Sequence, residues 1–442
     1  MRLLLIPIML LNHSSKLWKV NYPVPLSQRQ MSSTAFQYMP FSQRQRQALS
    51  WWLPNSPHYN KVMLICEGAV RSGKTIAALD SFLMWSLYAH RNQNFIIAGK
   101  SIGALRRNIV QPMKEILKAK GIPFNYQIST NVFLIGSNTY YLFGAPTQAS
   151  QDVLQGLTAA GCFLDEATLL PRNFIDQSLA RCSVENSKYF LTLNPESPLH
   201  HMKTDFIDRA HELNALVLHF DLDDNLSLSQ EAKSRLKSMF SGVFFERYIL
   251  GLWSMADGLV YPGFDHASMI VSELPKMVNY WIGVDYGHSN PTVFILTGLG
   301  IDGRFYIINE YYHSGKESTT RSPSQYSQDF IRWQTDLNIE PERIFIDPSA
   351  KGFITQLHHD GIRKIAKAGN SVLPGISKVS SLISMDKLRV HSSCTHTLKE
   401  FSTYSWDSKA QLTGTDRPSK QNDHVMDAIR YVATGASKHL FK

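Results

Sequence analysis

The segment Gly68–Thr75 restricts the possible folds of this chain more than any other segment. Its sequence, GAVRSGKT, matches the pattern G-x-x-x-x-G-K-[ST] at every fixed position. An apolar run, Lys61–Cys66, precedes it, and an amphipathic stretch, Thr75–Tyr88, follows it. A strand, a glycine-rich loop and a helix in this order predict a phosphate-binding loop, in which backbone N–H groups and a helix N-terminus face the phosphates. A glycine-rich surface turn, the alternative interpretation, does not require such flanks.

The residue types inside this loop suit nucleotide phosphates and a metal ion. Its two glycines let the backbone wrap inwards, Lys74 supplies a cation to the β and γ oxygens, and the Thr75 hydroxyl can ligate magnesium. Arg71 either reaches the γ-phosphate or faces the solvent. The residues expected to bind the nucleotide are Gly68, Arg71, Ser72, Gly73, Lys74 and Thr75.

An acidic pair and a polar pair follow two later strand-like runs. Asp165 and Glu166 come directly after the run Cys162–Leu164. In a nucleotide site, Asp165 would hold the magnesium and Glu166 would orient or deprotonate the attacking water. Thr192 and Asn194 end the next run and could sense the γ-phosphate, although Asn-Pro is equally typical of a plain turn.

A glutamine-rich segment upstream of the loop supplies a candidate adenine contact. A glutamine amide can both donate to and accept from an adenine edge. Either Gln43 or Gln45 could fill this role, and a polar surface helix would have the same composition.

Alternating strand-like and helix-like segments predict an α/β chain with two folded parts. Residues 36–200 predict a P-loop NTPase core of the ASCE type, in which Ala104–Ala119 forms one basic helix. The more polar residues 201–274 are interpreted as a linker or subdomain. Residues 275–442 begin with three strands, a helix and a fourth strand, the opening order of a ribonuclease-H-like fold.

Carboxylates in this last part occupy positions typical of a two-metal nuclease. Asp285 and Asp347 each end an apolar strand. Asp423 and Asp427 lie four residues apart in a predicted helix, so they share a face with His424 beside them. Such groups can converge at one sheet edge and hold two divalent ions that clamp the attacking water and the leaving oxygen of a phosphodiester. Any one of these aspartates could instead be a cap or a turn residue.

Taken in order, these motifs resemble the large terminase subunit of tailed bacteriophages, from about Phe41 to the end of the chain. The segments that carry the resemblance are GAVRSGKT, GLTAAGCFLDEA, TLNP, GLWSMADGLVYPGF, GVDYG, FIDPSA and NDHVMDAIRY. The resemblance implies ATP hydrolysis at the loop and the acidic pair, and coupling of hydrolysis to DNA movement by the polar pair. It implies metal binding by Asp285 and Asp347 with His424 beside them. The third metal ligand is Asp427, which we prefer, or Asp423.

The resemblance also implies cofactors and partners. These are ATP with Mg²⁺ for the motor, two Mg²⁺ or Mn²⁺ for the nuclease, and double-stranded DNA as the substrate. A ring, described as pentameric, would dock on the portal protein of a procapsid, and a small terminase subunit would select the DNA. Arg106 or Arg107 could reach the neighbouring subunit's nucleotide. The expected location is the host bacterial cytoplasm, transiently on the procapsid, with no membrane and no place in the mature virion.

Two other classes of protein share part of this pattern. A DNA helicase or remodeller with an appended nuclease would have the same loop and acidic pair, but residues 197–275 are short for a second motor lobe. An ATP-binding portal-docking subunit with an inactive nuclease would not need the intact spacing of Asp285, Asp347 and Asp427. Glu310, which ends a predicted strand, is either an extra metal ligand or a solvent-facing residue.

The bulk composition and the N-terminus add weaker indications. The formal net charge of +9 and the pI near 9.2 agree with a polyanionic partner. The four cysteines contain no C-x-x-C pair, which favours buried thiols. Leu3–Leu11 resembles a secretory signal but lacks a small-residue cleavage site and is too short to span a bilayer. Residues 1–35 are therefore interpreted as a leader, with Met31 favoured as the start.

Overall fold

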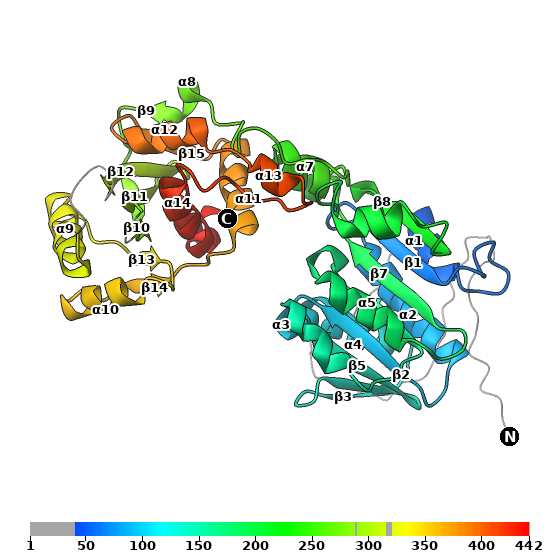
Figure 1. The fold of residues 1–442 in the computed structure, drawn as a ribbon. Coiled ribbons are helices and arrows are strands. Elements are labelled where there is room, and N and C mark those ends of the chain that lie inside the picture. The colour runs from blue at the N-terminus through cyan, green and yellow to red at the C-terminus, as the bar shows by residue number, and fades with distance from the viewer. Residues whose placement is uncertain (1–39, 288–289, 315–320, 442) are drawn as a thin grey trace, which may run out of the picture. The chain divides into compact units, whose positions relative to one another are not determined.

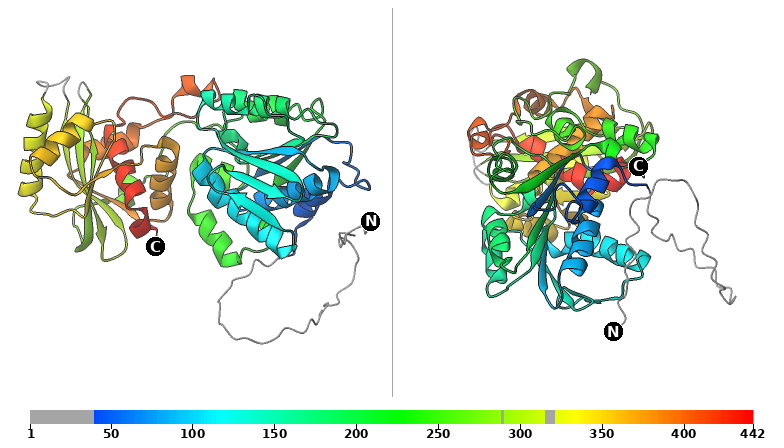
Figure 2. Two further views of the ribbon diagram at one scale, coloured as in Figure 1. Left: turned by 90° about the horizontal axis from the view of Figure 1, so that it is seen from below. Right: turned by 90° about the vertical axis from the view of Figure 1, so that its right-hand side faces the viewer.

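The computed structural model describes residues 40–287, 290–314 and 321–441. The expected leader, residues 1–35, lies outside the described residues. Two mixed sheets organise the chain, and helices lie on both faces of each sheet (Figure 1, Figure 2).

The first sheet has eight strands in the order β3-β4-β5-β2-β6-β7-β1-β8. The pairs among β5, β2, β6, β7, β1 and β8 are parallel, and β3, β4 and β5 pair antiparallel at one edge. Every residue of β1 is buried, as expected for a parallel strand with helices on both faces. The strands are β1 Met63–Gly68, β2 Asn94–Gly99, β3 Phe124–Gln127, β4 Val132–Ile135, β5 Asn138–Gly144, β6 Gly161–Leu164, β7 Lys188–Leu193 and β8 Ala215–Phe220.

Side chains on alternate positions of these strands pack against different helices. Phe163 faces Phe82 of α2, at 5.7 Å between ring centroids, whereas its neighbour Leu164 belongs to the cluster that contains Phe174 of α5. The helices of this part are α1 Gln43–Ser50, α2 Lys74–Ala89, α3 Ile102–Leu105, the π-helix η1 Arg106–Val110, α4 Gln111–Ala119, η2 Gln148–Leu154, η3 Ala167–Leu169, α5 Arg172–Arg181, η4 Met202–Ile207, η5 Leu222–Asp224, α6 Gln230–Ser238 and α7 Gly242–Tyr248.

Two features of this part differ from the expectation. The helix expected over Ala104–Ala119 is interrupted by the π-helix η1. Pro112 explains the interruption, because it lacks an N–H and its ring would clash with the carbonyl four residues earlier in a regular helix. The segment interpreted as a linker also supplies β8, which pairs with β1 over Met63–Gly68.

The second sheet has seven strands in the order β14-β13-β10-β11-β12-β15-β9. β10, β11 and β12 form an antiparallel meander, and the other pairs are parallel, which confirms the expected ribonuclease-H-like opening. The strands are β9 Ile270–Val271, β10 Met277–Asp285, β11 Thr292–Gly300, β12 Phe305–His313, β13 Arg343–Ile346, β14 Ile365–Lys367 and β15 Leu388–His391.

Helices cover the two faces of this sheet with separate cores. Residues of α11 and α14 join one core with Trp281, and residues of α9 and α10 join the other with Ile282. Gly283 allows the close approach of α14, because an added Cβ would lie 2.1 Å from the Ala428 carbonyl oxygen. The helices are α8 His266–Met269, α9 Pro323–Asp336, α10 Lys351–His359, α11 Val372–Ser384, α12 Thr395–Thr403, α13 Ser408–Gln411, α14 His424–Gly435 and α15 Ser437–Leu440.

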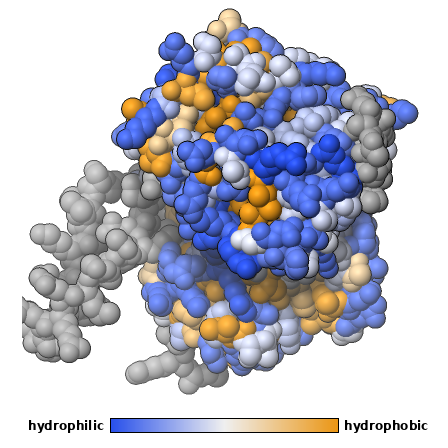
Figure 3. All heavy atoms as spheres, turned by 90° about the vertical axis from the view of Figure 1, so that its left-hand side faces the viewer, coloured by the Kyte–Doolittle hydropathy of each residue, from blue (hydrophilic) through white to orange (hydrophobic). Residues whose placement is uncertain are grey.

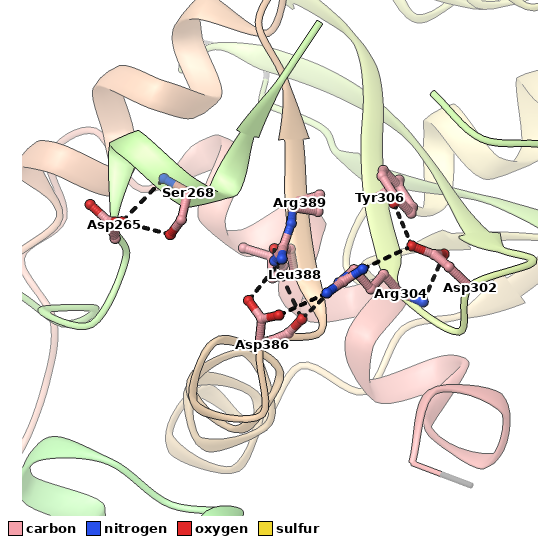
Figure 4. Close-up of polar contacts among 8 residues, drawn as sticks. All are labelled: Asp265, Ser268, Asp302, Arg304, Tyr306, Asp386, Leu388 and Arg389. Atoms are coloured by element: carbon pink, nitrogen blue, oxygen red, sulfur yellow. Dashed lines mark hydrogen bonds and ion pairs between the residues drawn. The ribbon is translucent and has the colours of Figure 1, made fainter. Parts of the chain in front are cut away.

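An ion-pair network lies where β12 and β15 begin (Figure 4). Arg304 Nη2 lies 2.9 Å from Asp386 Oδ2, Arg304 Nη1 lies 3.3 Å from Asp302 Oδ2, and Arg389 donates to Asp386 at 2.8 Å. β12 runs parallel to β10, because both are antiparallel to β11. The network therefore lies at the sheet edge opposite to Asp285, which ends β10.

The four cysteine side chains are all buried and form no disulfide, as expected from their spacing in the sequence. Hydrophobic residues on the face drawn in Figure 3 gather in small patches among hydrophilic ones. Over the described ranges, no helix combines the length and the apolar character needed to cross a membrane.

Candidate active sites

The glycine-rich loop has the expected position between β1 and α2. Gly68 ends β1 with φ of 128°, and Gly73 precedes α2 with φ of 84°, so both adopt conformations that favour glycine. An added Cβ at Gly68 would lie 2.2 Å from the Phe220 carbonyl oxygen, which excludes a larger residue. The strand, loop and helix predicted from the sequence are thus confirmed.

Lys74 is buried at the start of α2 and is held by two oxygens. Its Nζ donates to Asn194 Oδ1 at 2.6 Å and to the Ala69 carbonyl at 2.9 Å. Burial lowers the pKa of Lys74 to about 8, and the nearby Asp165 opposes this. The loop lysine and the polar pair at the end of β7 are therefore in direct contact.

The acidic pair is linked to the same polar pair. Thr192 Oγ1 donates to Asp165 Oδ1 at 2.8 Å, because β6 and β7 are parallel neighbours and both residues lie at the same sheet edge. Burial raises the pKa of Asp165 to about 6, and Glu166 adds to the rise, while Thr192 and Lys74 oppose it. Glu166 has φ of 50°, a strained conformation for a non-glycine residue.

The loop also contains polar groups that suit a phosphate ligand. Ser72 Oγ is buried and has no hydrogen-bond partner among the described residues. A buried hydroxyl without a partner is costly, and phosphate oxygens would satisfy it. The Arg71 side chain is exposed, and the backbone carbonyl of Arg71 accepts from Asn225 Nδ2 at 2.6 Å.

Of the two candidate adenine contacts, Gln45 lies against the loop. Gln45 Oε1 accepts from the Ser42 N–H at 3.0 Å, and Gln45 Nε2 lies 3.5 Å from the Gly73 carbonyl oxygen. Gln45 is buried, whereas Gln43 is exposed. Its position favours Gln45 over Gln43, although both ends of its amide already have partners.

In the second part, strand pairing brings two of the expected metal ligands together. Asp285 ends β10, and Asp347 directly follows β13. These strands are parallel, with Val284 opposite Ile346, so the two aspartates lie side by side at one sheet edge. Tyr431 of α14 donates its hydroxyl to Asp347 Oδ2 at 3.2 Å.

The start of α14 adds the other expected ligands. His424 Nδ1 lies 2.8 Å from Asp285 Oδ2. Burial raises the pKa of Asp285, and the charges of Asp427 and Asp423 add to the rise, while the hydrogen bond with His424 opposes it. Burial also raises the pKa of Tyr431, together with the charges of Asp285, Asp427 and Asp347. The expected ligands therefore lie close enough to influence one another.

Protein cations also neutralise these carboxylates. Arg430 Nε donates to Asp427 Oδ1 at 3.1 Å, and Lys420 Nζ lies 3.2 Å from Asp423 Oδ2 and 3.9 Å from Asp427 Oδ2. Within the described ranges, no three or more His, Cys, Asp or Glu side chains are already arranged to hold a metal ion. The donor set still fits Mg²⁺ or Mn²⁺, because it consists of hard carboxylate oxygens at one edge.

Glu310 has a different role from either expectation. It accepts from the backbone N–H groups of His396 and Thr397 at 2.7 and 2.8 Å, and from Thr397 Oγ1 at 2.7 Å. Glu310 thus caps the N-terminus of α12, so it is neither a ready metal ligand nor a solvent-facing residue.

Comparisons with known proteins identify the family. A family model described as terminase large subunit, T4likevirus-type, N-terminal, matches residues 65–268, and one described as terminase RNAseH like domain matches residues 285–434. The large terminase of a thermophilic bacteriophage is 41% identical, and the match covers 90% of this chain and 99% of that chain with a TM-score of 0.86. The chain belongs to the family of phage large terminase subunits.

Two further comparisons agree. The large terminase of the same thermophilic bacteriophage in complex with ADP is 41% identical, with a TM-score of 0.84 over 89% of this chain and 98% of that chain. The large terminase subunit of Escherichia phage T5 is 29% identical over 235 residues. That alignment covers 49% of this chain and 51% of the T5 protein, so it spans about half the length of that relative.

Family membership confirms the resemblance and the fold class: a terminase ATPase domain precedes an RNase H-like nuclease domain. Both candidate sites of this large terminase lie at carboxyl edges of parallel strands. Sequence reasoning missed Tyr431, Arg430 and Lys420 as neighbours of the nuclease carboxylates. For Tyr431 and Arg430, the available signal was their spacing of four and three residues from Asp427 on one helix.

The two arginines considered for a neighbouring subunit both lie on the π-helix η1. Arg106 Nη2 donates to Asn131 Oδ1 at 2.9 Å and to the Ile128 carbonyl at 3.1 Å, so this large terminase holds it against the β3–β4 hairpin. Arg107 is exposed. Arg106 is exposed as well, but of the two only its side chain has hydrogen-bond partners among the described residues.

Proposed function

We propose that this large terminase hydrolyses ATP at the phosphate loop to drive double-stranded DNA through the portal into a procapsid. The observation that carries the proposal is the hydrogen bond between Lys74 and Asn194, with Thr192 bonded to Asp165 beside it. These two hydrogen bonds connect Lys74 and Asp165, which would bind the nucleotide and its magnesium, with Asn194 and Thr192 at the end of β7. Thr192 and Asn194 would transmit the loss of the γ-phosphate to this strand.

The proposed coupling follows from competition for the lysine. Phosphate oxygens would compete with Asn194 for the Lys74 ammonium, because both are hydrogen-bond acceptors. When Lys74 turns to the phosphates, Asn194 loses its partner, and the end of β7 can move. Glu166 would orient the attacking water, and Arg71 from the same loop, or Arg107 from a neighbouring subunit, would stabilise the charge that develops.

We also propose that the second site cuts concatemeric DNA. Asp285, Asp347 and Asp427 would hold two Mg²⁺ or Mn²⁺ ions, and Asp423 is the alternative third ligand. Such ions supply an activated water and stabilise the leaving oxygen of a phosphodiester. The hydrogen bond from His424 orients Asp285. The charges of Asp427 and Asp423 both raise the pKa of Asp285, so both carboxylates lie near it, and Asp427 stays the preferred third ligand on its resemblance to the family motif.

The proposed partners follow from family membership. They are the portal protein, a small terminase subunit that selects the DNA, and further copies of this chain in a docked ring, described as pentameric. The proposed location is the host bacterial cytoplasm, with transient docking on the procapsid and no place in the mature virion.

A packaging assay tests the motor proposal. Purified chain, procapsids and linear DNA should yield DNA protected from DNase only when ATP is present. Replacing ATP by a non-hydrolysable analogue should abolish protection, because the motor then binds nucleotide but does not cycle. Protection that is equal with and without ATP would contradict the proposal.

A further inference from the structure

We propose that Glu400 is a positioning residue that sets the nuclease carboxylates of α14, a role that rests on the metal site proposed above. Glu400 belongs to α12 and is 3% exposed. Its Oε2 accepts from the backbone N–H groups of Val425 at 2.9 Å and Met426 at 3.1 Å. These two N–H groups belong to the first turn of α14, which also carries the carboxylate Asp427.

A helix N-terminus leaves N–H groups unpaired, and the side chain of its own N-cap residue usually accepts from them. The N-cap residue of α14 is Asp423, and its side chain makes no such bond. Glu400 from another helix takes over this task. The Asp423 carboxylate therefore remains available at the site, where Lys420 lies 3.2 Å away.

The cap also ties α14 to the sheet that carries Asp285. Glu310 lies on β12 and accepts from His396 and Thr397 at the N-terminus of α12. Two carboxylates thus form a chain: Glu310 fixes α12 to β12, and Glu400 on α12 fixes the first turn of α14. Because β12 and β10 belong to one sheet, this chain sets Asp427 relative to Asp285.

Glu400 does not act as a ligand in this proposal. Its Oε2 is shared by two backbone N–H donors, and a buried carboxylate without such partners would be strongly unfavourable. Residues that orient metal ligands in this way contribute to metal affinity without touching the ion. A loss of metal affinity therefore distinguishes a positioning residue from a residue with a purely structural role. Substitution of a purely structural residue would change only the free energy of unfolding.

The test is Mn²⁺ binding to the full chain, measured by isothermal titration calorimetry without DNA. Glu400→Ala should weaken binding about 10–100-fold, the usual loss when a residue that orients a ligand is removed. Glu400→Gln should bind within a few-fold of the unmodified chain, because its amide oxygen still accepts from both N–H groups. Thermal unfolding of each variant establishes that binding is measured on folded protein.

Arg304→Ala is the matched control, because it removes the ion pairs to Asp302 and Asp386 at the opposite sheet edge (Figure 4). It should lower the melting temperature and leave Mn²⁺ affinity unchanged. Equal affinity of Glu400→Ala and the unmodified chain overturns the proposal, and so does an equal loss in Arg304→Ala. If Glu400→Ala does not fold, Glu310→Ala decides, since unchanged Mn²⁺ affinity in that variant overturns the chain of caps.

The proposed metal site is tested separately in the same experiment. Asp285→Asn should abolish Mn²⁺ binding, since the neutral amide loses the charge that holds the ion. Binding that survives in Asp285→Asn shows that the metal site lies elsewhere. A loss in Asp285→Asn without a loss in Glu400→Ala keeps the site and overturns only the role of Glu400.

Discussion

At the scale of single residues, Glu166 is the side chain that we propose acts on the attacking water. It directly follows Asp165, whose carboxylate already accepts a hydrogen bond from Thr192. Its φ of 50° costs a non-glycine residue about 1–3 kcal/mol, a strain that proteins keep mainly at functional positions. Asp165 follows β6 and still donates its N–H to the Ala98 carbonyl of β2. The chain therefore leaves the sheet at Glu166, the residue with the left-handed backbone.

Glu166→Gln should bind ATP but hydrolyse it about 10²–10⁴-fold more slowly, because the amide cannot accept a proton from water. Lys74→Ala should lose both binding and hydrolysis, since the cation for the β and γ oxygens is gone. A fluorescent ATP analogue measures binding, and phosphate release measures turnover. Glu231→Gln, an exposed change on α6, is the control. Normal turnover in Glu166→Gln would remove this residue from the mechanism.

Glu196, two residues beyond Asn194, makes the stability of the chain depend on pH. Burial raises its pKa to about 7, with Asp416 adding to the rise and Arg247 and Lys100 opposing it. A folded-state pKa above the ordinary 4.5 means that the folded chain binds the proton more tightly than the unfolded chain. The stability that this proton contributes is therefore lost as the pH rises from 4.5 to about 7.

Glu196→Gln removes this titration, so the variant should gain stability relative to the unmodified chain as the pH rises through that window. The measurement is the melting temperature of both proteins across the window. Glu185→Gln, for which no neighbouring cation is described, serves as the control. A melting-temperature difference that stays constant with pH would show that Glu196 does not titrate abnormally.

At the scale of elements, α7 connects the phosphate loop with the core of the nuclease domain. The Tyr248 carbonyl at its end accepts from the Val70 N–H at 2.8 Å, and Phe244 belongs to the hydrophobic core around Trp281. Arg247 pairs with Asp416 at 2.5 Å, and the two side chains are only 4% and 1% exposed. The helix α7 thus forms a backbone hydrogen bond with the phosphate loop and places an aromatic side chain in the nuclease core.

Arg247→Ala should lower the free energy of unfolding by about 3–5 kcal/mol, because it leaves the buried Asp416 without its partner. Chemical denaturation measures this loss. Replacing both partners by apolar residues, Arg247→Met with Asp416→Leu, should recover much of the stability, since neither charge is then buried. If the double variant is less stable than Arg247→Ala, the ion pair is not the source of the loss.

Elements with a strong local pattern could be predicted from the sequence. The loop around Lys74 is fixed by its own glycines, and the antiparallel pair β4–β5 follows from two apolar runs around a short turn. The strand β8 was missed because its place beside β1 depends on a distant partner. The π-helix was missed because the helix expected over Ala104–Ala119 was drawn through Pro112, although a proline inside a helix removes an N–H and clashes with the carbonyl four residues earlier.

For the candidate sites, the sequence could predict which residues end strands but not what they contact. Asp285 and Asp347 were recognisable because each follows an apolar run. The hydrogen bond that commits Glu310 to the N-terminus of α12 requires knowledge of where α12 packs. The proximity of Lys420 to Asp423 likewise depends on the conformation of the loop before α14, which has no periodic pattern to predict it.

At the scale of the whole molecule, the nuclease core recruits residues that precede its first predicted strand. Val260, Tyr261, Phe264 and Met269 are buried in the same cluster as Trp281. Phe264 stacks on Phe401 of α12 with 4.1 Å between ring centroids. The strand β9 also extends the second sheet by pairing with β15. The unit that folds alone should therefore include these residues.

A fragment of residues 241–442, which begins at the N-cap of α7, should fold and cleave DNA with Mn²⁺ in the absence of ATP. A fragment of residues 274–442 should be far less stable, because losing even one buried aromatic side chain costs about 3–5 kcal/mol against a typical domain stability of about 5–15 kcal/mol. Circular dichroism with thermal unfolding compares the two, and a plasmid-nicking assay measures cleavage. EDTA and Asp285→Asn should each stop the longer fragment, since both remove the metal. Equal stability of the two fragments would mean that residues 241–273 add nothing to the core. A folded longer fragment that is inert with both Mg²⁺ and Mn²⁺ would mean that DNA cutting requires the ATPase domain.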